Sequence, residues 1–172
     1  MKGEIKVHAK LEDGPSLLNF AQDLKRIVVK ENMSVDISGK KYVLVEAWQF
    51  VGGYLGVVPV VTELTDMSSD KTIKYRASVE LRKLDGTVVG NGIAVCSNNE
   101  RGKGGFADYA VASMAQTRAT GKAYRLTFGW LVKMAGYEAT PIEEMDGEQV
   151  DPATNDIELK DVADKIKQSK NN

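Results

Sequence analysis

The chain has 172 residues, 42% of them hydrophobic and 27% charged, with a formal net charge of −1 at pH 7. This length suits one compact domain, and no apolar run approaches the ~20 residues that cross a bilayer, so we expect a cytoplasmic protein without a membrane partner. One cysteine and one histidine exclude an internal disulfide and the common four-ligand zinc patterns. The charge is divided unevenly, because residues 1–140 carry 19 Lys/Arg against 15 Asp/Glu while residues 141–172 carry 4 against 9.

The first predicted element is an amphipathic helix over residues 14–32. Its apolar residues recur at helical spacing; they are Leu17, Leu18, Phe20, Ala21, Leu24, Ile27 and Val28. A turn is expected at residues 38–40. Residues 42–53, which include Trp48, can then form a short helix, although their valines also suit a strand. We therefore expect one or two helices ahead of the sheet.

Three strands follow in the prediction. Residues 55–64 are rich in valine, and Pro59 favours an edge or a bulge there. Residues 73–82 alternate between apolar and polar side chains, and Asp85-Gly86 then supplies a hairpin turn.

Pairing Leu84 with Thr87 fixes the register of this hairpin. On one face it opposes Tyr75, Ala77, Val79 and Leu81 to Cys96, Ala94, Gly92 and Gly90. On the other face it opposes Lys74, Arg76 and Arg82 to Ser97, Val95 and Val89. The first face is lined by small residues and leaves room for a helix, and Cys96 is expected there as a buried, reduced thiol.

The longest predicted helix spans residues 106–135 and is stopped by Gly136. The fold class is therefore α+β, with a β-β-β-α core in which an antiparallel sheet packs against one long helix. A short final helix is expected to begin near Pro141. Residues 1–146 form the expected domain, and residues 147–172 form an acidic tail that we expect to be mobile, since it contains few apolar residues.

The long helix carries the pattern that bears on function. Arg118, Lys122, Arg125 and Lys133 fall on one stripe, and no acidic residue lies between Tyr109 and Met134. A solvated helix face is the ordinary interpretation of such a stripe, but uncompensated charge favours an anionic partner. With Lys74, Arg76 and Arg82 of the hairpin, these residues form a candidate DNA-binding set. Aromatic residues of the same helix could stack on bases, although core packing is the commoner role.

Several other chemistries find little support. His8 has no nucleophile beside it in a recognisable motif. The glycine-rich residues 102–105 lack the spacing of a phosphate-binding loop, so we expect no nucleotide, metal or other cofactor and no catalytic residues. Two alternatives to DNA binding stay open. One is an assembly protein without DNA function, and the other is a small enzyme that uses carboxylates such as Glu80 or Asp108.

The segment AQTRATGKAYRLTFGW at residues 115–130, preceded by the Asp85-Gly86 hairpin and Gly90-Asn91-Gly92, resembles phage single-strand annealing proteins related to the eukaryotic Rad-fifty-two recombination mediator. The continuation MAGYEATPIEEM at residues 134–145 is similar to the same group, and the likeness covers residues 40–145. Carried over, the basic helix positions are Lys122 and Arg125, with Arg118 one turn earlier. The basic run of the family is denser, and Ala123 interrupts it here.

The resemblance implies a β-β-β-α core, self-assembly into rings or arcs, and a positively charged groove that holds single-stranded DNA for annealing. It implies a role in homologous recombination and repair, in a bacterial or phage-infected cell, without ATP or catalysis. A single-strand binding protein is a candidate partner. Independently of the resemblance, the apolar positions Val89, Ile93 and Val95 exceed what a solvent-facing strand surface usually carries, which predicts a homo-oligomer.

Overall fold

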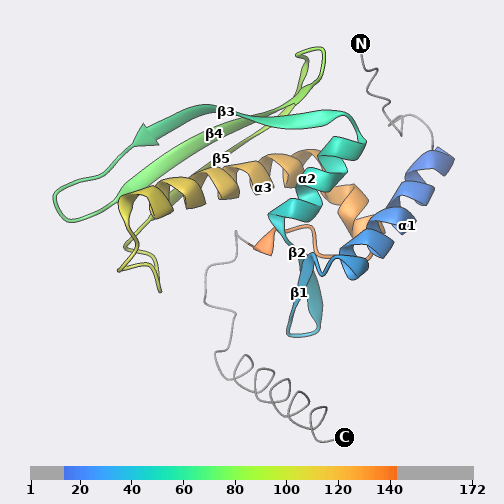
Figure 1. Cartoon of the computed structure of the whole chain (residues 1–172), viewed down its shortest axis with the longest axis horizontal. Helices are drawn as coiled ribbons and strands as arrows, with labels where there is room; N and C mark the ends of the chain where they lie inside the picture. Colours follow the sequence, from blue (N-terminus) through green and yellow to red (C-terminus); the bar gives the residue numbers. More distant parts are fainter. Residues whose placement is uncertain (1–13, 143–172) are drawn as a thin grey trace, which may run out of the picture.

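The computed structural model describes residues 14–142 and has the predicted α+β arrangement (Figure 1). An antiparallel sheet of three strands, in the order β3-β4-β5, is covered on one face by the long helix α3. The elements of this core are β3 (Val57–Asp66), β4 (Lys74–Lys83), β5 (Val88–Ser97) and α3 (Asp108–Met134). No helix in this part of the chain is both long enough and apolar enough to cross a membrane.

Two helices and a small hairpin precede the sheet and lie toward the C-terminal half of α3 (Figure 1). They are α1 (Gly14–Lys30), β1 (Ser34–Ile37), β2 (Lys40–Val43) and α2 (Val45–Tyr54). The small hairpin was not predicted. Ser38 and Gly39 form its two-residue turn with φ of 52° and 77°, the left-handed values that match the twist of a tight hairpin. The helix expected from residue 42 therefore begins three residues later.

The register predicted for β4 and β5 is confirmed from Tyr75 opposite Cys96 to Leu81 opposite Gly90. The prediction for the last pair is wrong, because Arg82 lies opposite Val88 and not Val89. One extra residue in β5 forms a bulge here. As a result Val89 packs partly against the core on the α3 side, beside Thr127 and Phe128.

The inner face of the sheet holds the core that joins it to α3. Ala77, Val79, Leu81 and Cys96 are all buried there, as predicted for the thiol. Trp48 of α2 and Tyr124 of α3 are fully buried on the other side of the helix. Burial of side chains this large contributes about 2–3 kcal/mol each to stability before losses in entropy.

Gly136 ends α3 as predicted, in the left-handed conformation with φ of 91°. The Tyr137 amide donates to the Val132 carbonyl and the Gly136 amide to the Lys133 carbonyl, which satisfies the last carbonyls of the helix. The chain then returns along α3, so that Pro141 lies over Gly121. The predicted final helix and the acidic tail lie outside the described residues, apart from the first positions near Pro141.

Candidate nucleic-acid interface

Arg118 differs most from its prediction. It was expected to present an uncompensated charge, but it is 8% exposed and its Nη1 lies 2.8 Å from the Glu100 carboxylate. The same atom is 3.4 Å from the Val95 carbonyl oxygen of β5. Arg118 therefore fastens the segment after β5 to α3. Its compensating acid lies outside the helix, so the helix sequence alone does not indicate it.

Glu100 is the centre of this cluster, because Lys103 also pairs with its carboxylate. Burial acts to raise the pKa of Glu100, but the hydrogen bonds from Lys103 and the Ser97 amide, together with Arg118, outweigh burial and hold that pKa below its usual range. The carboxylate is thus ionised at neutral pH. The pair of Glu100 and Arg118 therefore stabilises the fold. Contact of Arg118 with DNA stays a prediction.

Arg125 and Lys133 are also engaged within the fold. The Nζ of Lys133 is 3.1 Å from the Glu138 carboxylate, in an exposed ion pair just past the helix end. Arg125 lies between Gly121 and Gly129, over which residues 139–141 pass, and its Nε is buried. The four helix cations are therefore not an open stripe along α3.

Lys122 is the helix cation whose charge no described carboxylate compensates. Its side chain is partly exposed, and within residues 14–142 no carboxylate forms an ion pair with it. It follows Gly121, where the returning chain crosses the helix. Among the predicted helix cations, Lys122 is thus the best placed to meet an external phosphate.

The second predicted set lies on the outer face of the sheet, opposite α3. Lys74, Arg76 and Arg82 occupy alternate positions of β4, the central strand, and therefore share this face with Ser78 and Glu80, which lie between Arg76 and Arg82. Arg76 pairs with Glu63 at 3.1 Å and Arg82 with Glu80 at 2.7 Å, whereas no described carboxylate pairs with Lys74. Both pairs are solvent-accessible, so their net contribution to stability is small and a phosphate can compete for the cations.

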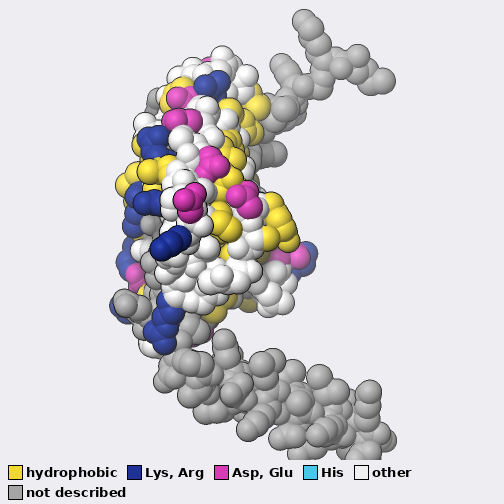
Figure 2. Space-filling view, turned by 90° about the vertical axis from the view of Figure 1, so that its left-hand side faces the viewer, with side chains coloured by type: hydrophobic (Ala, Val, Ile, Leu, Met, Phe, Trp, Pro, Cys, Tyr) yellow, Lys and Arg dark blue, Asp and Glu magenta, His cyan; other side chains and the backbone are white. Residues whose placement is uncertain are grey.

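Apolar side chains accompany these cations. Val58, Ile93 and Val95 share the outer face by their register and are each at least 40% exposed. A space-filling view shows Lys and Arg side chains along one margin of the molecule, beside a mixed surface of acidic and apolar groups (Figure 2). The surface is thus suited both to anions and to another apolar surface.

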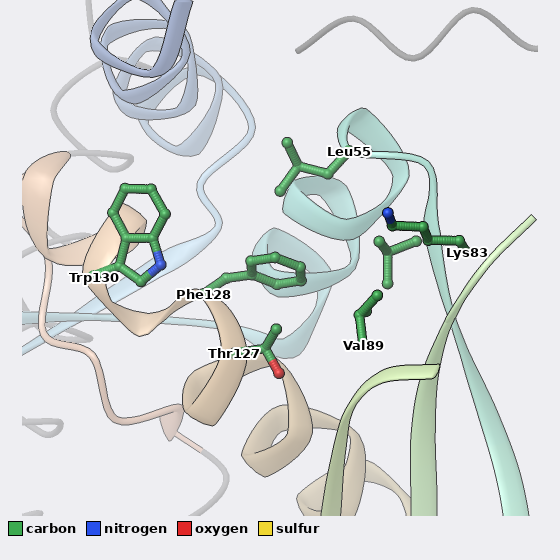
Figure 3. A pocket seen from close by; sticks show the side chains of 7 residues that line it. Leu55, Lys83, Val89, Thr127, Phe128 and Trp130 are labelled. Carbon is green, nitrogen blue, oxygen red and sulfur yellow. The ribbon is translucent and has the colours of Figure 1, made fainter. Parts of the chain in front are cut away.

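The predicted stacking residues divide into core and surface. Tyr124, Phe128 and Tyr137 are buried and pack in the core, while Tyr109 is 77% exposed and Trp130 is 45% exposed. Trp130 also borders a hollow of about 220 Å³ with Lys83, a cation that the sequence prediction did not include (Figure 3). Only the structure shows this proximity, because the two residues are 47 positions apart.

The carboxylates suggested for an enzyme do not converge. Glu80 is paired with Arg82, and Asp108 accepts a hydrogen bond of 2.8 Å from the Tyr75 hydroxyl, which raises the pKa of Tyr75 to about 12. Neither carboxylate borders the hollow of Figure 3. In the described part of the chain, no group of three or more His, Cys, Asp or Glu side chains could hold a metal ion.

No protein-family model and no curated protein matches the chain. The function of these residues is therefore inferred from their chemistry and from the order of elements in the fold. Two features bear on it most directly: the cations on the outer face of β4, and the partly exposed Lys122 of α3.

Proposed function

We propose that the protein binds single-stranded DNA and anneals complementary strands, without ATP, as a homo-oligomer. The observation that carries this proposal is the position of Lys74, Arg76 and Arg82 on the outer face of the central strand. Lys74 and Arg76 are ~7 Å apart along the strand, and Arg82 lies ~20 Å beyond Arg76, past Ser78 and Glu80, so the cations can contact an extended phosphate backbone at two separate points. Lys122 would add a further phosphate contact from the helix.

Such contacts are independent of sequence. Each cation that neutralises a phosphate releases a condensed counterion, which favours binding and makes it dependent on salt. Because the cations hold the backbone, base edges stay available for a second strand. Base pairing then supplies the specificity of annealing, and a row of subunits extends the length of strand that is held.

The direct test is the salt dependence of binding to a labelled single-stranded oligonucleotide. Replacing Lys74 and Lys122 with alanine should weaken binding at low salt and reduce the slope of log K against log salt by about 0.7 per lost contact. The double variant Lys40→Ala/Lys71→Ala, at two exposed positions outside the proposed site, is the matched control because it removes the same charge elsewhere. Unchanged affinity and slope in the double variant would refute the assignment, and an annealing assay with complementary oligonucleotides tests the activity.

An assembly protein without DNA function remains a second candidate. It is favoured by the exposed Val58, Ile93 and Val95, which give the outer face an apolar character. In that case the cations of β4 would pair with carboxylates of a partner protein. A mobility shift with single-stranded oligonucleotide separates the two candidates, since only the first predicts a complex.

A further inference from the structure

The hollow at the end of the sheet is lined mainly by apolar side chains, with a tryptophan on one side and a lysine on the other. Leu55, Val57, Val89 and Phe128 supply the apolar walls, where the start of β3, the bulge of β5 and α3 meet. Figure 3 shows Phe128 between Trp130 on one side and Lys83 on the other, with Thr127 beside it. An aromatic ring and a cation thus face each other across an apolar surface.

The size and polarity of the hollow indicate a small planar group. At about 220 Å³ it is smaller than the pockets that enclose drug-sized ligands. The Thr127 hydroxyl donates to the Ala123 carbonyl at 2.9 Å and its oxygen lies against Gly90, so the side of the hollow at Thr127 is apolar. Every nucleobase offers an aromatic face. The hollow can therefore take a base without regard to sequence.

We infer that the hollow between Trp130 and Lys83 binds one unpaired nucleobase, which stacks on Trp130 while an adjacent phosphate contacts Lys83. This inference rests on the proposed function, because it assigns to the bound strand a base contact in addition to phosphate contacts. Stacking on aromatic side chains and cationic contacts to the backbone are the two components of sequence-independent single-strand binding. The stacked base would fix the position of the strand on each subunit.

The chain provides its own reporter for this contact. It has two tryptophans, of which Trp48 is fully buried and Trp130 is 45% exposed. Base stacking on an indole quenches its emission, so oligothymidylate should quench the full-length protein and should not quench Trp130→Phe, which retains Trp48. An abasic oligomer of the same length offers phosphates without bases. It should bind through the cations and leave the Trp130 emission unchanged.

Affinity measurements complete the test. Trp130→Ala should weaken oligothymidylate binding about tenfold, while Trp130→Phe should keep most of the affinity because a ring remains. Val29→Ala is the control, since Val29 is exposed on α1 and does not border the hollow. Lys83→Ala should weaken binding of both oligomers.

The outcomes separate this inference from the proposed function. Binding of oligothymidylate without quenching, and with no loss in Trp130→Ala, would overturn the base site and leave DNA binding intact. Absence of binding to either oligomer would overturn both. A shift of Trp130 emission with protein concentration alone would assign the hollow to contact between copies of the chain, and would also overturn the base site.

Discussion

Gly92 of β5 and Ala123 of α3 are in such close contact that a Cβ on residue 92 would lie 2.5 Å from the Ala123 backbone nitrogen. The Ala119 carbonyl oxygen would be at 2.6 Å from the same position. Both of these neighbours are backbone atoms of one helix, so neither can move unless the helix itself shifts. The sheet and the helix are therefore held at a separation that only glycine permits at this position.

Gly92→Ala should lower the free energy of unfolding by about 3 kcal/mol, because the helix must shift away from the sheet to admit one methyl group. Gly53→Ala provides the control, since a Cβ at residue 53 of α2 meets nothing within 4 Å. That variant should be neutral or slightly more stable, as glycine is a poor helix former. Urea unfolding followed by circular dichroism measures both. Equal stability of Gly92→Ala and the wild type would contradict the close contact.

The register of β4 and β5 could be predicted because two local signals agree. The alternation of residues 73–82 assigns the faces, and Asp85-Gly86 fixes the turn. The bulge at Val89 could not be predicted, since it depends on how the last residues of β5 pack against Thr127 and Phe128. The hairpin of β1 and β2 was missed because its strands have only four residues each.

The candidate site was predicted less well than the fold. Helical spacing predicts which cations share a side of α3, but it does not indicate what covers that side. Glu100, 18 residues before Arg118, neutralises one cation, and the returning residues 139–141 cover the flank of another. Both partners come from irregular segments, whose positions carry no periodic signal.

Glu100→Gln should destabilise the protein by about 1–3 kcal/mol at neutral pH, because the ion pair between the buried Arg118 guanidinium and the Glu100 carboxylate would be lost. The pKa of Glu100 is lowered in the folded state, so this contribution is present above the unfolded pKa and is lost as the pH falls through the folded pKa. The stabilities of the wild type and the variant should therefore approach each other as the pH falls below the ordinary glutamate pKa of 4.5 and converge once it is below the lowered pKa of Glu100. Thermal unfolding between pH 3 and pH 7 checks this.

Glu63→Gln is the appropriate control for that experiment. Glu63 also pairs with an arginine, Arg76, but its side chain is 53% exposed. The loss of an exposed pair should change stability by less than about 1 kcal/mol. A similar loss in both variants would show that burial of the Glu100 cluster is not what makes it stabilising.

Acidic residues that follow Ile142 should reduce the affinity for DNA. The described chain crosses α3 at Gly121, next to Lys122, and the next residues in the sequence are Glu143 and Glu144. Tethered carboxylates are present at high effective concentration and compete with phosphate for a nearby cation. Removing them should strengthen oligonucleotide binding about threefold to tenfold at low salt, and the gain should fade as salt rises.

Two full-length variants with equal charge changes test this competition. The first carries Glu143→Gln, Glu144→Gln, Asp146→Asn and Glu148→Gln, and the second carries Asp156→Asn, Glu158→Gln, Asp161→Asn and Asp164→Asn. Only the first should bind DNA more tightly if proximity to Lys122 matters. Adding Lys122→Ala to it should remove most of the gain. Equal gains in the two variants would attribute the effect to net charge alone.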